Sequence, residues 1–409
     1  MDRAALVKRN QARATELRRA GPKQRLRDSM LAGIARFPVN TAKSDGERLL
    51  IVRPDHLGDV LLSTPAIQAL KRSRPDLSIH VLCGEWSAEA LANYDEIDRV
   101  LTLSFPGFAR AASSTLGPWR LAAQTARRLR RIGYVSAIVM RPDHWWGALV
   151  AHLAGVPRRV GYDLRNVAPF LTEVVAHKFT HTVEQNLRLV APWTGHIDPG
   201  EIKLEFPLQA ADRAGASELL DSRKIDPYKP IVCLHPGSGA ASKVWLADKW
   251  ARTGDAIAAE FGALIVFTGT ASEAPLVNEI AADMRADAVC LAGETSIGQL
   301  AAIYARSRAV LGPDSGALHL AAAVGTPTAA LFGPADPQEF APWGDPRLHE
   351  VVTANIGCRP CRILDWRNDE SDYHPCVRDI STQRVIEAAQ RVLREGHRPE
   401  LDQSPPGSP

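Results

Sequence analysis

Apolar and polar residues follow a regular pattern from residue 49 onward, in which short apolar runs alternate with helical segments. In the first half, apolar runs predict strands at 49–52, 79–82, 100–103 and 135–140. Between them, helical spacing of the apolar residues predicts helices at 60–72, 119–131 and 144–154. Strands that alternate with helices form βαβ units, so we expect this half to build one parallel sheet.

The second half repeats the pattern after a change in composition at 193–230, which is richer in Pro, Gly and charge. Its apolar runs predict strands at 231–234, 264–268, 288–291, 309–311 and 328–331, and a final amphipathic helix is predicted at 381–395. Two doubly wound α/β halves are the simplest interpretation. The predicted regions are an N-terminal extension (1–45), a first Rossmann-like domain (46–205), a second Rossmann-like domain (206–395) and a disordered tail (396–409).

The first 43 residues are unusually basic, with 11 Lys or Arg against three Asp or Glu. Within them, Leu26, Met30, Ile34 and Phe37 recur at helical spacing and predict an amphipathic helix. An apolar face flanked by Lys and Arg suits an anionic lipid surface, although most charge runs are only solvated faces. Both interpretations stay open for this extension.

The composition changes this picture little. A chain of 409 residues is longer than one core usually grows, which agrees with two domains. A hydrophobic share of 45%, a charged share of 23% and a formal charge of +3 are typical of a soluble globular protein that binds no nucleic acid. No apolar run approaches the roughly 20 residues of a spanning helix, and no signal peptide is present, so we expect a cytoplasmic protein.

The sharpest motif of the first half is Arg-Pro-Asp-His-Leu-Gly-Asp-Val at 53–60, directly after the first predicted strand. Ligands of doubly wound sheets bind at such strand ends. Gly58 permits a tight turn, and the charged form of Asp59 is favoured in a first helical turn, where a carboxylate can act as a general base. Capping of the helix by Asp55 or Asp59 explains the same residues equally well. Asp55, His56 and Gly58 are the candidate acceptor-side residues.

Two loops of the second half suit a phosphate group. His-Pro-Gly-Ser-Gly at 235–239 follows a predicted strand, and Ser238, Ser242 and Lys243 would supply hydroxyls and a positive charge. The spacing is not that of a Walker loop. The loop at 269–273 follows the next strand, and Glu273 is either a contact to a ribose or base or a capping residue in the first helical turn.

The segment Gly-Pro-Asp-Ser-Gly-Ala-Leu-His at 312–319 joins a predicted strand to a predicted helix. Backbone N–H groups at the open end of such a helix bind phosphate well, so Ser315 and Gly316 are candidate donor contacts. Asp314 would cap the helix or bond a sugar hydroxyl. His319 lies one turn further and faces either the ligand or the core.

A late cluster of metal-ligating residue types comprises Cys358, Cys361, His374 and Cys376. These types suit a structural zinc ion, but the spacing is unusual and three thiols can equally pack in a loop. The chain contains no Asp-x-Asp, which argues against a donor held through a carboxylate-bound divalent ion. We therefore expect no metal in catalysis and no cofactor.

Taken together, these motifs resemble glycosyltransferase family 9, the heptosyltransferases of the lipopolysaccharide inner core. The resemblance spans about residues 48–395 and rests on the motifs at 53–70, 235–245 and 312–334 and on the late cysteine segment. It implies a GT-B fold whose first domain holds a glycolipid acceptor and whose second holds a nucleotide sugar, usually an ADP-linked heptose. By position it implies Asp59 as general base, Lys243 as phosphate partner, and Glu273, Asp314, Gly316 and His319 as donor contacts.

Both lines of argument predict an inverting, metal-independent transfer of a heptose or related sugar from an ADP-sugar. The acceptor would be the lipopolysaccharide core or another glycolipid. The enzyme would act in the cytoplasm or at the surface of the inner membrane. Two alternatives remain. A sugar-nucleotide epimerase uses the same fold without an acceptor, and a non-catalytic module would only bind the nucleotide sugar. A dinucleotide dehydrogenase is disfavoured, because no Gly-x-Gly-x-x-Gly follows a strand.

Overall fold

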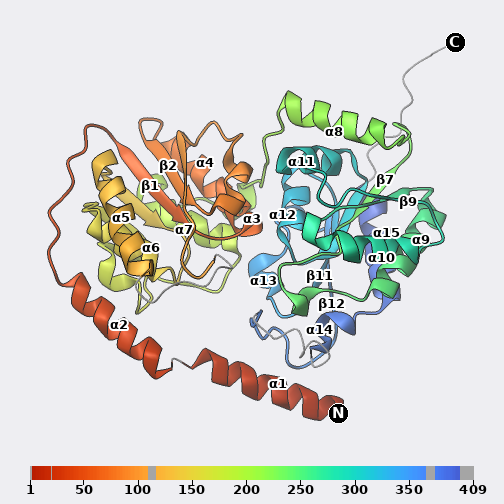
Figure 1. Cartoon of the computed structure of the whole chain (residues 1–409), viewed down its shortest axis with the longest axis horizontal. Coiled ribbons are helices and arrows are strands. Elements are labelled where there is room, and N and C mark those ends of the chain that lie inside the picture. The colour runs from red at the N-terminus through yellow and green to blue at the C-terminus, as the bar shows by residue number, and fades with distance from the viewer. Residues whose placement is uncertain (1, 20, 109–116, 365–373, 397–409) are drawn as a thin grey trace. The chain divides into compact units, whose positions relative to one another are not determined.

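The structure is a computed structural model that describes residues 2–19, 21–108, 117–364 and 374–396. It divides into two compact units (Figure 1). We call residues 19–202 the N-terminal unit, and residues 203–409 together with residues 1–18 the C-terminal unit. The predicted disordered tail falls almost entirely outside the described residues. No helix in the described part of the chain is both long and apolar enough to cross a membrane.

The N-terminal unit is built on one six-stranded parallel sheet. The strands follow the order β3-β2-β1-β4-β5-β6, with β1 Arg48–Arg53, β2 Ser78–Cys83, β3 Arg99–Thr102, β4 Ser136–Val139, β5 Arg158–Tyr162 and β6 Glu173–Val175. The helices are α2 Pro22–Ala35, α3 Leu57–Leu61, α4 Thr64–Ser73, α5 Gly117–Ile132, α6 Trp145–Leu153 and α7 Thr182–Thr194. Short 3-10 turns are η1 Glu85–Ser87, η2 Glu89–Leu91, η3 Ala168–Phe170 and η4 Pro199–Glu201.

The C-terminal unit has a second parallel sheet with the order β12-β11-β10-β7-β8-β9. Its strands are β7 Ile231–Leu234, β8 Leu264–Phe267, β9 Ala288–Cys290, β10 Ala309–Pro313, β11 Thr328–Phe332 and β12 His349–Thr353. Its helices are α1 Arg3–Arg18, α8 Ala210–Ser222, α9 Ala247–Phe261, α10 Ala274–Ala282, α11 Ile297–Arg306, α12 Gly316–Ala323, α13 Pro337–Phe340, α14 Pro375–Arg378 and α15 Thr382–Glu395. The 3-10 turns are η5 Ala241–Lys243 and η6 Ala271–Glu273.

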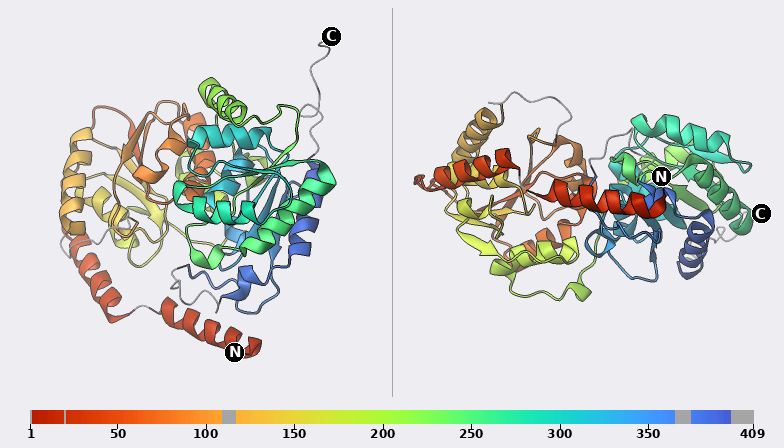
Figure 2. Two further views of the ribbon diagram at one scale, coloured as in Figure 1. Left: turned by 45° about the vertical axis from the view of Figure 1, so that its right-hand side comes forward. Right: turned by 90° about the horizontal axis from the view of Figure 1, so that it is seen from below.

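Both sheets are buried because helices cover them (Figure 2). Strands β4, β7, β8, β10 and β11 are buried along their whole length, as expected for central strands of a parallel sheet. In the C-terminal unit, α8 packs on α11, while α15 packs on α9 and on β12. The amphipathic helix predicted at 381–395 is α15, which buries Val385, Ala389 and Val392.

The strand order explains where ligands can bind. Both sheets have the doubly wound order in which the first strand of the unit pairs with the second and the fourth, and successive connections run in opposite directions from there. This switch point lies between β1 and β4 in the N-terminal unit and between β7 and β10 in the C-terminal unit. The motifs at 53–60, 235–239 and 312–319 follow β1, β7 and β10, whereas the loop with Glu273 follows β8 and the late cysteines follow β12.

The basic N-terminal extension differs from the prediction of one amphipathic arm. It contains two helices, α1 and α2, and the second begins at Pro22 after Gly21. Leu31, which was outside the predicted apolar face, is fully buried against the N-terminal unit, and Ile34 packs against the same core. The remaining residues of the predicted face, Leu26, Met30 and Phe37, are exposed.

Candidate functional site

A buried cluster of paired charges follows β1 and β4 in the N-terminal unit. Arg53 ends β1, and its Nε lies 3.2 Å from Oδ2 of Asp55. Arg141, from the loop after β4, pairs with the other carboxylate oxygen of Asp55. Burial disfavours the ionised carboxylate, but the two arginines outweigh it and lower the pKa of Asp55. Asp55 is therefore a buried, ionised anchor that organises the loop.

Asp59 occupies a more accessible place in the same cluster. It lies in the first turn of α3, where the helix dipole favours a carboxylate. Arg53 donates to the Asp59 carbonyl at 3.1 Å and to its Oδ1 at 3.4 Å, which orients the side chain. The side chain of Asp59 is 35% exposed, whereas that of Asp55 is only 3% exposed. Of these two carboxylates, Asp59 is the one that can reach a substrate.

Two aromatic residues that no motif predicted, Trp86 and Phe108, border this cluster beside the predicted His56. The ring of His56 lies 5.6 Å from that of Trp86 and 6.4 Å from that of Phe108, measured between centroids. Trp86 donates its indole N–H to the Asp55 carbonyl at 3.0 Å, and the Arg141 guanidinium lies 5.1 Å from the Phe108 ring centroid. His56 is exposed and Trp86 and Phe108 are partly exposed, so these rings offer an apolar surface beside Asp59.

A repeated tetrapeptide could have revealed Arg141. The sequence Arg-Pro-Asp-His occurs at 53–56 and again at 141–144, after the two strands that pair at the switch point. The second copy contributes Arg141, which pairs with Asp55, and His144, which packs under the aromatic rings. His144 is buried beneath the aromatic rings, and burial is the main cause that lowers its pKa to about 4.

The central feature of the C-terminal unit is an ion pair between Lys243 and Asp314. Lys243 ends η5, Asp314 follows β10, and Nζ lies 2.6 Å from Oδ2 and 3.3 Å from the Asp314 carbonyl oxygen. Both side chains are largely buried, at 14% and 7% exposed. The structure thus brings together two residues that the sequence analysis assigned to separate motifs.

Two buried hydroxyls accompany this ion pair. Within the described part of the chain, the hydroxyl oxygens of Ser242 and Ser315 are buried and have no hydrogen-bond partner. Ser315 occupies the N-cap position of α12, and Gly316 is the first residue of that helix, so the helix end meets the ion pair at Asp314. His319 is buried in the same helix. Buried hydroxyls without partners are costly, and a bound polar ligand would satisfy them.

The loops after β7 and β8 meet at Gly237 and Glu273. A Cβ at Gly237 would lie 2.1 Å from the Glu273 carboxyl carbon, so the carboxylate lies directly against the backbone of Gly237. Glu273 also forms a capping box, in which its Oε2 accepts from the Thr270 N–H at 2.7 Å. Glu273 therefore has the capping role, which was one of its two predicted roles. It also lies against the predicted phosphate loop at 235–239. In that loop, Ser238 is partly exposed.

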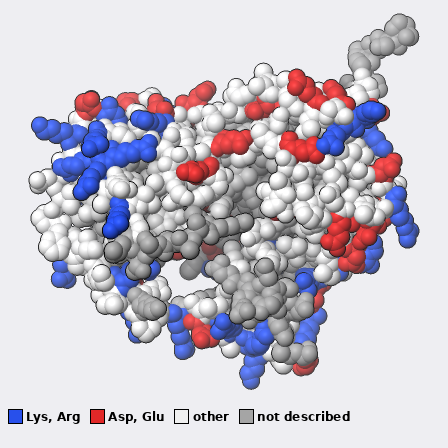
Figure 3. Space-filling model, in the orientation of Figure 1, with Lys and Arg blue, Asp and Glu red and all other residues white. Residues whose placement is uncertain are grey.

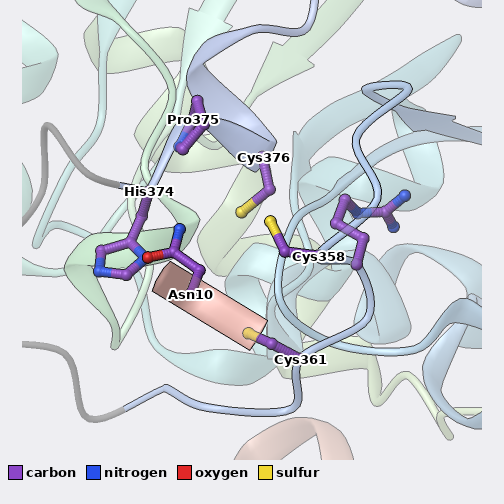
Figure 4. A pocket seen from close by; sticks show the side chains of 7 residues that line it. Asn10, Cys358, Cys361, His374, Pro375 and Cys376 are labelled. Atoms are coloured by element: carbon purple, nitrogen blue, oxygen red, sulfur yellow. The ribbon is translucent and has the colours of Figure 1, made fainter. Parts of the chain in front are cut away.

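The late cysteines gather around one small cavity. It is lined by Asn10, Cys358, Arg359, Cys361, His374, Pro375 and Cys376, and Figure 4 shows the sulfur atoms of Cys358 and Cys376 turned toward each other. Burial, with a further contribution from the other two thiols, raises the pKa of Cys376 to about 12. Among the described residues, no three side chains are arranged to hold a metal ion. The structural zinc site stays a prediction.

The chain resembles known proteins over most of its length. Glycosyltransferase family 9 (heptosyltransferase) matches residues 122–369. Lipopolysaccharide heptosyltransferase 2 of Salmonella typhimurium is 26% identical over 373 residues, which cover 85% of this chain and 99% of that protein.

Solved structures agree with the fold. A family 9 glycosyltransferase from Veillonella parvula aligns with a TM-score of 0.71 at 21% identity, covering 87% of this chain and 100% of that one. E. coli ADP-heptose lps heptosyltransferase II aligns with a TM-score of 0.66 at 22% identity, covering 85% and 99%. The two doubly wound sheets are those of the GT-B fold, as predicted. With its family match covering more than half of its residues, this chain belongs to glycosyltransferase family 9 and is a glycosyltransferase.

Proposed function

We propose that this enzyme transfers a heptose from an ADP-heptose donor to a lipopolysaccharide-core acceptor, with inversion at the anomeric carbon. The exposed position of Asp59 carries the proposal, because a general base must reach the acceptor hydroxyl. The names of the similar proteins support the sugar and the acceptor, and the name of the E. coli structure supports the ADP-linked donor.

The N-terminal unit is assigned the acceptor. Asp59 accepts the proton of the attacking hydroxyl, while Arg53 keeps the carboxylate oriented. The rings of His56 and Trp86 lie beside it and suit the apolar face of a sugar. Gly58 is buried in the first turn of α3, one residue before Asp59.

The C-terminal unit is assigned the donor. As the acceptor oxygen bonds to the anomeric carbon, the bond from that carbon to the diphosphate breaks, and negative charge grows on the leaving ADP. Lys243 and the N–H groups at the start of α12 would stabilise this charge in place of a metal ion, with Ser242 and Ser315 as further donors. Glu273 and Asp314 are left to bond hydroxyls of the ribose or the sugar, and His319 is a further donor-side candidate.

The reaction is placed at the cytoplasmic side of the membrane. A charged sugar nucleotide does not cross a bilayer readily, so the donor is used on the side where it is made. The acceptor carries lipid, and the enzyme must therefore work as a peripheral protein at that surface.

Product analysis tests the proposal and separates it from the epimerase alternative. The enzyme is incubated with ADP-heptose, with and without a heptose-deficient core glycolipid, and the products are followed by mass spectrometry and by NMR of the anomeric proton. We expect a glycolipid heavier by one heptose, of inverted configuration, and equimolar ADP only when acceptor is present. A new ADP-sugar formed without acceptor would instead identify an epimerase.

A further inference from the structure

The two helices of the N-terminal extension attach to different units. α1 is docked on the C-terminal unit: Arg3 pairs with Asp379 at 3.1 Å, and the Gln11 amide donates to the Gly357 carbonyl at 2.8 Å. α2 is docked on the N-terminal unit through Leu31, which is fully buried. The extension is therefore part of the folded protein, and lipid can bind only to the faces of its helices that stay exposed.

The outer face of α2 is an exposed apolar stripe. Leu26, Met30 and Phe37 are 65%, 53% and 70% exposed. Leu26 and Met30 lie four residues apart on one side of α2, away from the buried Leu31, and Phe37 follows two residues after the helix ends at Ala35. Large apolar side chains that gather on one exposed face indicate a surface that another apolar phase covers.

Helix α5 contributes a basic face in the same unit. Arg120, Arg127, Arg128 and Arg131 are exposed, and the helix contains no acidic residue. None of these four arginines forms an ion pair with another described residue. Figure 3 shows Lys and Arg side chains gathered over this part of the unit, where α5 lies in Figure 1.

The two helices are neighbours on one side of the N-terminal unit. Trp119 of α5 contacts Trp145 of α6 with ring centroids 5.8 Å apart, and the Arg27 guanidinium of α2 lies 5.3 Å from the Trp145 ring centroid. Arg130 of α5 also donates to the Asn40 carbonyl, which follows α2, at 2.6 Å. These contacts place α2 and α5 near each other on one side of the unit.

We propose that α2 and α5 form a docking surface for an anionic phospholipid bilayer. The apolar stripe enters the boundary between headgroups and acyl chains, and the α5 arginines bind the phosphate groups of anionic lipids. A surface with exposed apolar side chains and unpaired arginines fits a charged bilayer as its partner. A protein partner with a purely apolar face would leave the arginines without counter-charges. The inference rests on the proposed function only in that a lipid-linked acceptor makes a bilayer the expected partner.

Vesicle binding tests this surface with the full-length protein. Sedimentation is measured with vesicles of phosphatidylcholine alone and of phosphatidylcholine mixed with phosphatidylglycerol. We expect binding only to the anionic vesicles. Replacing Leu26, Met30 and Phe37 by Ser together should weaken it by about tenfold or more, and replacing the four α5 arginines by Gln should weaken it similarly and abolish its dependence on salt.

Matched variants separate these effects from a general loss of apolar or basic surface. Phe179→Ser removes an equally exposed aromatic residue, 67% exposed, from the same unit. On α15, Arg391 and Arg394 are already paired with Glu350 and Glu260, so Arg391→Gln with Arg394→Gln removes positive charge that is locally neutralised. Both controls should bind vesicles like the parent, and circular dichroism should show every variant folded.

Vesicle binding that is unchanged in both α2 and α5 variants would overturn the proposal. Light scattering that shows a parent dimer and a monomeric Leu26, Met30 and Phe37 variant would also overturn it, because a second copy would then cover the stripe. ADP binding should be the same in all variants. A failure of the proposed transfer reaction would leave vesicle binding unaffected, so the two proposals fail independently.

Discussion

The two units place their polar residues at the same point of the same topology but use them differently. In the N-terminal unit, Arg53 and Arg141 clamp the buried Asp55, and Arg53 extends to Asp59. In the C-terminal unit, the ion pair between Lys243 and Asp314 lies among glycines and serines. The first arrangement fixes one carboxylate at the surface, whereas the second leaves small residues and hydroxyls around a cation. The doubly wound order thus sets where the chemistry lies, and the strand-end residues decide what it is.

The largest effect is expected from removing the carboxylate that the N-terminal unit exposes. Asp59→Asn keeps the shape and the contact with Arg53 but cannot accept a proton, so kcat should fall by about 10²–10⁴-fold. The measurement is initial rate against acceptor concentration. Asp95→Asn, at an exposed position in the same unit, is the control and should leave kcat unchanged. A near-parental rate for Asp59→Asn would remove Asp59 as the base.

The second prediction concerns the cation of the C-terminal unit. Lys243→Ala removes the charge that faces the leaving diphosphate, and kcat/KM for the donor should fall by about 10²–10³-fold. Because the change leaves Asp314 buried without its partner, thermal unfolding must show that the variant is folded at the assay temperature. Lys229→Ala, which removes an exposed lysine, should change neither quantity. Parental donor kinetics in Lys243→Ala would contradict the assignment.

A third prediction separates the buried anchor from the exposed carboxylate. Asp55→Ala leaves Arg53 buried without its main partner, so the free energy of unfolding should fall by about 3–5 kcal/mol. Asp143→Asn breaks a contact to the same Arg141, but Asp143 is 60% exposed, and its loss should cost less than about 1 kcal/mol. Urea unfolding measures both. Equal losses would show that the cluster is not organised around Asp55.

The smallest effect is a change in pH dependence. Burial holds the pKa of His144 at about 4, below the ordinary value of 6.5, so the folded protein keeps this ring neutral while the unfolded chain protonates it. The stability that comes from the neutral ring is complete above pH 6.5 and is lost as the pH falls toward 4. His144→Phe should therefore lose less Tm than the parent between pH 7 and pH 5. Parallel curves would show that His144 does not contribute.

The central strands could be predicted from sequence, whereas three strands nearer the edges could not. Buried strands such as β7 and β8 are continuous apolar runs, which are easily recognised. β5 begins with Arg158 and Arg159, β6 has only three residues, and β12 begins with His349 and Glu350, so their burial is partial and their apolar signal is weak. The prediction therefore found nine of the strands and missed these three.

The site residues divide in a similar way. Lys243 and Asp314 could be proposed because each lies in a motif, but their pairing depends on strand order, which joins β7 to β10 across a long stretch of sequence. Trp86 and Phe108 lie outside any motif, and only the fold brings them to His56. The attachment of α1 to the C-terminal unit likewise depends on contacts with residues more than 300 positions away.

Calorimetric binding of ADP to Asp59→Asn and Lys243→Ala tests the division of labour between the units most directly. The account predicts that Asp59→Asn binds ADP as tightly as the parent while its kcat falls by about 10²–10⁴-fold, and that Lys243→Ala binds ADP more weakly. Weakened ADP binding in a folded Asp59→Asn variant, together with parental binding in Lys243→Ala, would contradict it, because the donor site would then lie with Asp59 in the N-terminal unit.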